Sequence, residues 1–275
     1  MDRKNYYMSL KHLLVVLLIF FTVNILFSLL YPLFSEDIDV YMFSKLSYIP
    51  TFLTVIILTY IYGRHVKKRT GQTDVFHSKA HFNAIYVLMG VLYMFVFSIL
   101  LEPLEYYLDI DMNNYLNMFN QGSLAFNILI TVISAPILEE IFFRGLVLRN
   151  LLNRYKEHWA IIFSALFFSI AHMSLVQSVP AFFMGLLFGY IYVRTNRSLS
   201  TVIWVHLINN LLSYAMIVYD VADDPLFFYN FFSSKIYYVI TYGIAFMLTV
   251  LLILLIFKDR KVISNEKIQL EDEDK

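Results

Sequence analysis

The sequence predicts an all-α, polytopic transmembrane helix bundle of about eight spans, with both termini on the cytoplasmic side. Three observations predict it. Of the 275 residues, 59% are apolar and only 15% are charged, whereas a soluble domain is about half apolar and a quarter charged. The apolar residues gather in stretches long enough to cross a bilayer. The basic residues fall in alternate connections between these stretches.

The apolar stretches define eight candidate spans, counted against the roughly 20 residues that a transmembrane helix needs. The first follows a short basic segment, as the core of a signal peptide would. It is long enough to span, however, and no small-residue cleavage site follows it, so we interpret it as a retained span. The predicted spans are residues 13–33, 46–63, 83–101, 124–143, 159–176, 179–193, 199–218 and 236–257.

No internal repeat or linker divides the chain into separate soluble domains. The spans nevertheless form three groups along the sequence. Residues 1–123 contain the first three spans, and residues 124–218 contain a core of four spans. Residues 219–275 contain the last span and a charged tail that should be cytoplasmic and disordered.

Basic residues mark one side of the predicted membrane. They occupy the N-terminal segment, "GRHVKKRTG", the connections after the fourth and sixth spans, and "KDRK". The other connections, which include "SEDIDV" and "YDVADDP", are acidic. Because Lys and Arg are retained in cytoplasmic connections, this pattern predicts a multi-pass protein of the cell membrane with both termini inside.

Net charge and cysteine content exclude several classes of function. The formal net charge is zero, which argues against a nucleic-acid partner bound by bulk electrostatics. The chain has no cysteine, which excludes disulfides, a thiol nucleophile and cysteine-ligated zinc.

Three of the predicted spans carry polar side chains where an apolar surface is expected. A charged group at the bilayer centre costs on the order of 2.5–3.5 kcal/mol, so such groups should face the bundle interior and find partners there. The groups are Glu139, Glu140 and Arg144 in the fourth span, His172 in the fifth, and His206, Asn209 and Asn210 in the seventh.

The two adjacent glutamates should have different surroundings, because successive helical residues differ by about 100° around the axis. Glu140 and Arg144 are four residues apart with the acid N-terminal, which is the favoured order for an ion pair on one helix face. This pair is predicted to be structural. Glu139 has no cation four residues later, so its carboxylate is left available for chemistry.

His206 and Asn210 are also four residues apart and share one helix face. With Glu139 and His172 they could converge in a single intramembrane cavity. A glutamate with a histidine beside it can deprotonate water as a general base. A second histidine and an asparagine can donate hydrogen bonds to an oxyanion. This set is suited to peptide-bond hydrolysis without a covalent intermediate.

Structural interpretations of the same residues remain open. An intramembrane histidine can be a packing residue or part of a proton relay. Asn210 could join two helices by a hydrogen bond, although Asn209 is our choice for that role. Gly185 and Gly189 form a GxxxG pair, which predicts close packing of helices.

Three short segments match the sequence motifs of a known family. "EEIFFR", "FSIAH" and "HLINN" fit the patterns E-E-x-x-x-R, F-x-x-x-H and H-x-x-x-N, in this order on successive helices. Across about residues 124–215 the chain therefore resembles the CPBP family (CAAX protease and bacteriocin-processing, or Abi) of intramembrane glutamic endopeptidases. The resemblance implies that residues 124–218 are a catalytic core.

The resemblance also implies roles for individual residues. Glu139 and His172 would activate the attacking water, while His206 and Asn210 would stabilise the oxyanion. The structural supports would be Glu140, Arg144 and Phe168. No cofactor is expected. The family was earlier regarded as metal-dependent, but zinc is disfavoured here because the sequence lacks an H-E-x-x-H motif.

The leading hypothesis is a CAAX-prenyl-protease-like hydrolase that cuts a peptide or a membrane-proximal protein segment within the lipid bilayer. The alternative is a non-catalytic bacteriocin-immunity or envelope scaffold protein that uses the same cavity. The change Glu139→Ala should abolish the function of the first and spare that of the second. A proton-coupled transporter is disfavoured, since the chain shows no repeated halves. The sequence indicates neither the substrate, nor its prenylation, nor an oligomeric state.

Overall fold

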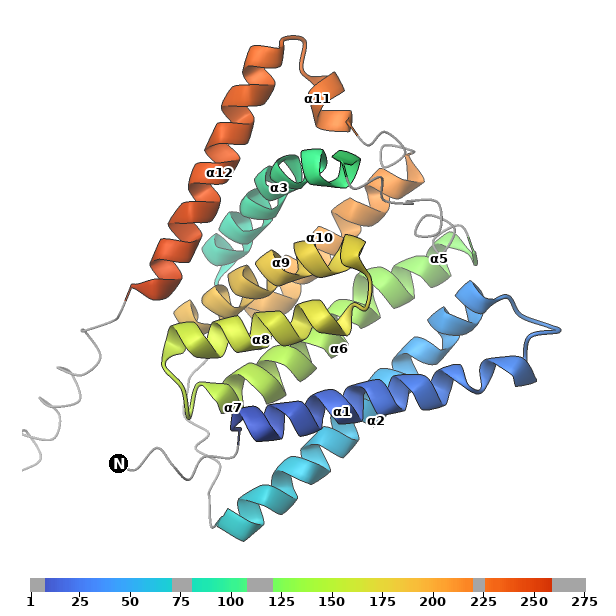
Figure 1. Ribbon diagram of the computed structural model, residues 1–275. Coiled ribbons are helices and arrows are strands. Elements are labelled where there is room, and N and C mark those ends of the chain that lie inside the picture. The colour runs from blue at the N-terminus through green and yellow to red at the C-terminus, as the bar shows by residue number, and fades with distance from the viewer. Residues whose placement is uncertain (1–7, 71–80, 108–120, 220–225, 259–275) are drawn as a thin grey trace, which may run out of the picture.

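The computed structural model describes residues 8–70, 81–107, 121–219 and 226–258, and all regular secondary structure in these ranges is helical (Figure 1). The elements are α1 (Leu10–Ser28), the 3₁₀ turn η2 (Tyr31–Leu33), α2 (Val40–Thr70), α3 (Ala84–Tyr107), α5 (Leu124–Asn127), η3 (Ile128–Ser134), α6 (Ala135–Glu140), η4 (Ile141–Leu148), α7 (Arg149–Leu151), α8 (Glu157–Ala171), α9 (Leu175–Arg194), α10 (Leu199–Val218), α11 (Phe227–Phe231) and α12 (Lys235–Phe257).

Six helical stretches in the described ranges are long and apolar enough to cross a membrane. The chain is therefore a multi-pass membrane protein, as the sequence predicts. The six are Leu10–Leu33, Val40–Lys68, Ala84–Pro103, Leu124–Leu151, Leu199–Val218 and Lys235–Phe257.

The other two predicted spans, residues 159–176 and 179–193, correspond to α8 and α9. Helix α8 has 15 residues, which is about 22 Å of helix and less than the hydrocarbon core of a bilayer. Helix α9 has 20 residues and is not among the six either. In the part of the chain that the structure describes, six stretches rather than eight qualify by length and composition. The tail after residue 258 and most of "YDVADDP" lie outside that part.

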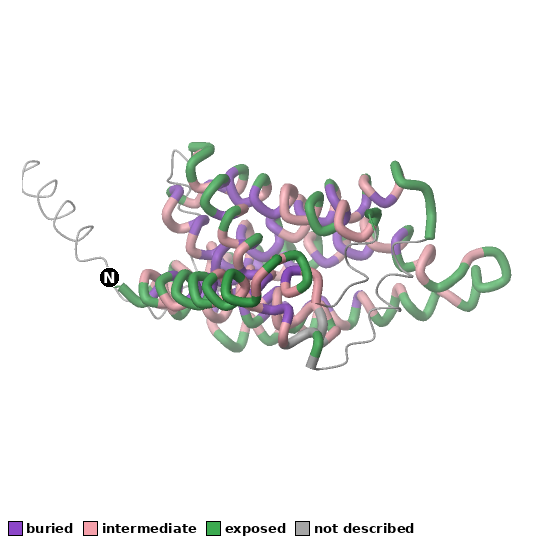
Figure 2. The backbone as a smooth tube through the Cα atoms, turned by 90° about the horizontal axis from the view of Figure 1, so that it is seen from above, coloured by how far each residue is buried: buried purple, intermediate pink, exposed green. Residues whose placement is uncertain are grey.

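Aromatic side chains fill the centre of the bundle. The ring of Phe142, which is fully buried, contacts the rings of Phe20 on α1, Phe52 on α2 and Phe167 on α8, with centroids 5.8–6.1 Å apart. Buried positions lie inside the bundle and exposed ones on its outer surface (Figure 2). Because many exposed side chains are large and apolar, this outer surface is suited to contact with lipid chains.

Helices α8 and α9 form a hairpin and pack closely at Gly185 (Figure 1). A Cβ atom added to Gly185 would lie 2.8 Å from the Cα atom of Ala165 on α8. A Cβ atom on Gly189 would lie 3.0 Å from the side chain of Ile161. The close helix packing predicted from the GxxxG pair is confirmed.

The change Gly185→Ala is expected to lower the free energy of unfolding by about 1–3 kcal/mol, because the added methyl group meets backbone atoms that cannot move aside. Gly243→Ala on α12 is the matched control, since nothing lies within 4 Å of its added Cβ. Thermal unfolding of both variants in the same detergent checks this. Equal melting temperatures would contradict the close contact at Gly185.

The helix that runs from Leu124 to Leu151 is interrupted by two π-helical segments, η3 and η4, on either side of α6. Pro136 accounts for the first. Proline has no N–H and its ring clashes with the carbonyl four residues earlier, and a wider turn relieves both problems. In η3 the N–H of Ala135 donates to the carbonyl of Ile130, five residues earlier. Such π segments are frequent at functional sites.

Candidate active site

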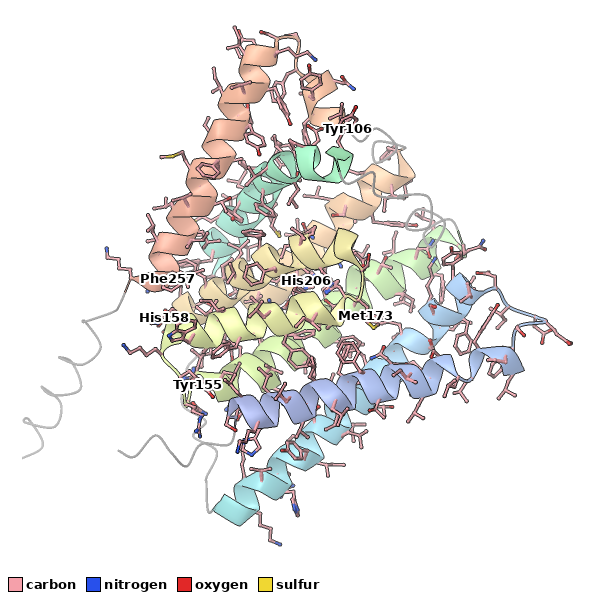
Figure 3. The ribbon with its side chains drawn as sticks, viewed as in Figure 1. Tyr106, Tyr155, His158, Met173, His206 and Phe257 are labelled. Atoms are coloured by element: carbon pink, nitrogen blue, oxygen red, sulfur yellow. The ribbon has the colours of Figure 1, made fainter. Side chains whose placement is uncertain are left out.

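A cavity of about 1060 Å³ lies within the bundle, and its wall includes residues of α1, α2, α3, η3, α6, η4, α8, α9, α10 and α11. The four residues predicted to be catalytic, Glu139, His172, His206 and Asn210, all line it. They come from three separate helical segments, and His206 lies near the middle of the bundle (Figure 3). Most of the wall is apolar, so these side chains form a small polar group in a hydrophobic pocket, which is typical of ligand sites.

Glu140, Arg144 and His206 form a buried hydrogen-bonded group beside the cavity. Nη1 of Arg144 donates to Oε1 of Glu140 over 2.9 Å, and both side chains are completely buried. The ion pair expected from the sequence is therefore present. Nδ1 of His206 lies 2.9 Å from the same oxygen. A carboxylate only accepts hydrogen bonds, so we assign a proton to this nitrogen.

The guanidinium group of Arg144 lies between two aromatic rings. Its Cζ atom is 4.6 Å from the ring centroid of Phe168 and 5.0 Å from that of Phe188. Its Nη2 donates to the carbonyl of Gly185 over 3.4 Å. Cation–π contacts of this kind favour a buried positive charge, and they tie η4 to α8 and α9. Phe168 thus supports Arg144 directly.

Glu139 faces the cavity rather than the surrounding lipid. Its Oε1 accepts a hydrogen bond of 2.6 Å from the hydroxyl of Tyr48 on α2. Its Oε2 lies 3.8 Å from Nε2 of His206, which is too long for a direct hydrogen bond. The other nitrogen of the same ring contacts Glu140. The two adjacent glutamates point in different directions from the helix, and the ring of His206 lies between their carboxylates. One ring nitrogen faces Glu140 and the other faces Glu139.

His172 is placed by the end of α8. It is the C-cap of that helix, and Met173 after it adopts a left-handed conformation with φ of 52°, which ends the helix at this point. Reciprocal side chain-to-backbone hydrogen bonds between Ser169 and Ser178 close the turn into α9.

The side chain of His172 is oriented by the backbone of its own helix. Nδ1 lies 2.8 Å from the carbonyl oxygen of Phe168. Since a carbonyl only accepts, this nitrogen must carry a proton, and Nε2 of the neutral ring keeps its lone pair. No hydrogen bond or ion pair joins His172 to Glu139 among the described residues. The two share the cavity wall.

Asn210 is anchored by the π segment η3. Its Nδ2 donates to the carbonyl of Thr131 over 2.9 Å. The π pattern would pair that carbonyl with the residue five positions later, Pro136, which has no N–H. The proline thus leaves an acceptor for Asn210. Asn210 therefore makes the bond between helices that the sequence predicts for Asn209. Nδ2 of Asn209 lies 3.3 Å from Oδ1 of Asn210.

Tyr48 and Lys45 are among the polar residues of the cavity that sequence reasoning missed. Tyr48 is one of 21 tyrosines, and nothing in its neighbourhood distinguishes it from an interfacial aromatic residue. Lys45 precedes the second predicted span, residues 46–63, but it lies on α2 and is only 3% exposed. Its Nζ donates to the carbonyl of Gln121 and to Oδ1 of Asn127. Lys45 is buried against these oxygens because of tertiary packing, and the sequence around it does not indicate that it is buried.

Comparison with known proteins connects this site to one family. Residues 121–212 match the family described as type II CAAX prenyl endopeptidase Rce1-like. Over 91 residues the chain is 32% identical to "Putative membrane peptidase YdiL" of Bacillus subtilis (strain 168). That alignment covers 33% of this chain and 35% of the relative, so the chain spans about a third of the length of the relative that it matches. No solved structure matches the chain significantly.

Proposed function

We propose that the chain is an intramembrane endopeptidase that hydrolyses a peptide bond in a peptide or membrane-proximal protein segment, since residues 121–212 match the Rce1-like family. One observation carries this proposal. Glu139, His172, His206 and Asn210 come from distant parts of the sequence and line a single cavity. Buried ionisable groups in a membrane span are costly, and they usually mark a functional site.

In the proposed mechanism, Glu139 is the general base. Its Oε1 is held by the hydroxyl of Tyr48, and its Oε2 is left to accept a proton from water. The lone pair on Nε2 of His172 orients the same water. The resulting hydroxide attacks the carbonyl carbon of the scissile amide. The proton held by Glu139 then passes to the leaving amine, so that water and amide become an acid and an amine.

The oxyanion would be stabilised by His206 and Asn210. Asn210 uses one N–H for Thr131, so its second N–H is available. Donation from Nε2 of His206 requires the imidazolium form, because Nδ1 already donates to Glu140. Charge balance supports this form. Two carboxylates and the guanidinium of Arg144 leave one negative charge around the ring, which the imidazolium neutralises.

Metal-free hydrolysis fits the donor set of the cavity. Glu140 and Nδ1 of His206 are engaged with each other. The described residues contain no group of three His, Cys, Asp or Glu side chains arranged to bind a metal ion.

We expect cleavage of a peptide library by the purified protein in detergent, detected by mass spectrometry, to persist in EDTA. Loss of cleavage in EDTA, with recovery on adding zinc, would overturn the metal-free mechanism. Absence of fragments in both conditions would overturn the endopeptidase proposal.

The change Tyr48→Phe is expected to lower kcat by roughly 10- to 100-fold. A hydrogen bond to a charged group contributes about 1.5–3 kcal/mol, and 1.36 kcal/mol corresponds to tenfold in rate. Without the hydroxyl, Glu139 would no longer be held in place. Tyr31→Phe is the control, because Tyr31 also lines the cavity. Steady-state kinetics of the two variants checks this, and equal values of kcat would remove Tyr48 from the mechanism.

A further inference from the structure

The cavity occupies only one end of the bundle. It is lined by the last part of α1 from Phe20 onward, the first part of α2 up to Phe52, and the last part of α3 from Met94 onward. On α10 the lining begins at His206 and continues toward the C-terminal end of that helix. Helices α1, α3 and α10 finish at this end and α2 starts from it. We call it the rim end.

The opposite end of the bundle has a different composition. Tyr155, His158 and Phe257 lie there, whereas Tyr106 lies at the rim end (Figure 3). The contacts agree, since the hydroxyl of Tyr155 accepts a hydrogen bond from the N–H of Leu10, and the rings of His158 and Phe257 are 5.4 Å apart. This end carries the basic segments of the chain, with Arg64, Lys67, Lys68, Arg149, Arg154, Lys156, Arg194, Arg197 and Lys258. We call it the basic end.

The connections at the rim end are acidic. The one between α1 and α2 contains Glu36, Asp37 and Asp39, and Asp220, Asp223 and Asp224 follow α10 in the sequence. Short connections rich in Lys and Arg stay in the cytoplasm. The basic end is therefore assigned to the cytoplasm, and the rim end to the opposite side of the membrane.

We propose that the cavity opens on the extracytoplasmic side, and that it receives peptide segments that have already crossed or entered the membrane from that side. The location of the opening does not depend on the reaction. The statement about the substrate rests on the proposed endopeptidase function. Under it, the substrate class is an exported peptide or the outer membrane-proximal segment of a membrane protein.

Exposed residues on the cavity wall lie at the rim end. Ser28, Ser44 and Ser213 line the cavity and are exposed, and Met173 is 62% exposed. At the inner part of the cavity, His206 and Phe143 are buried. The cavity thus leads from an exposed, hydroxyl-bearing rim to a buried polar group. About 22 Å of helix separates Leu124, at the rim end, from Glu139, so the site lies well below the extracytoplasmic surface.

Single cysteines provide the test, because the chain contains no cysteine of its own. Ser213→Cys and Ser44→Cys place a thiol on two walls of the rim, and Asn153→Cys places one in the connection between α7 and α8. Intact cells that express each variant are treated with a membrane-impermeant maleimide, before or after permeabilisation. The unmodified chain measures background labelling.

Ser213→Cys and Ser44→Cys are expected to be labelled in intact cells, and Asn153→Cys only after permeabilisation. The reverse pattern, or labelling of all three variants in intact cells, would overturn the proposal. The readout requires no catalysis, so it stands even if the chain cleaves no peptide. Conversely, the protein could cleave peptides while its two rim cysteines are labelled only after permeabilisation. That result would leave the endopeptidase proposal standing and overturn the extracytoplasmic opening.

Discussion

The change Glu139→Gln is expected to slow peptide hydrolysis by roughly 10²–10⁴-fold, which is the contribution of a positioned general base. The amide cannot take a proton from water. It has nearly the same shape as the carboxylate, and its oxygen can still accept the hydrogen bond from Tyr48, so the cavity should keep its form. Initial cleavage rates of the variant and the unmodified protein, in the same detergent and with the same peptide, measure the effect.

Glu102→Gln is the matched control for this prediction. Glu102 lines the same cavity and is also buried, but its carboxylate accepts hydrogen bonds from the N–H groups of Phe228 and Tyr229 at the start of α11. Its variant should cleave at close to the unmodified rate. If Glu139→Gln retains more than roughly a tenth of the activity, Glu139 is not the general base.

The change Arg144→Met is expected to lower the free energy of unfolding by about 3–5 kcal/mol, as is usual when one partner of a buried ion pair is removed. Glu140 would remain completely buried, with only His206 beside it. The contacts of the guanidinium with Phe168 and Phe188 would also be lost. Denaturant unfolding in detergent, followed by circular dichroism, measures the change.

The double variant Glu140→Gln, Arg144→Met separates the charge effect from the packing effect. It leaves no unpaired charge, and Nδ1 of His206 can still donate to the amide oxygen at position 140. It should therefore be more stable than Arg144→Met alone. The single variant Glu140→Gln completes the cycle. A double variant that loses the sum of the effects of Glu140→Gln alone and Arg144→Met alone would show that the pair contributes no coupling energy.

The transmembrane character and the polar site could be predicted from the sequence, because both follow from local spacing. Six apolar stretches are long enough by themselves to indicate spans. The pairing of Glu140 with Arg144 follows from their separation by four residues on one helix. The cost of burying charge in a membrane is also local information, and it indicates that Glu139 and His206 should point inward.

The remaining features depend on tertiary structure or on backbone irregularity. The hydrogen bond from Tyr48 to Glu139 joins residues 91 positions apart, and no motif records it. Ideal helical geometry predicts separate surroundings for the two glutamates, and it gives no indication that the ring of His206 reaches both. The π segments likewise change the register of a helix whose apolar pattern looks continuous.

The link between Asn210 and Thr131 has a consequence for how this helix pair can evolve. The acceptor belongs to the main chain, so any side chain that fits at position 131 preserves it. The link depends instead on the amide at position 210 and on the proline at position 136, because a residue with an N–H there would compete for the carbonyl. Tolerance at position 131 and intolerance at the other two should therefore be visible in a saturation-mutagenesis scan of all three.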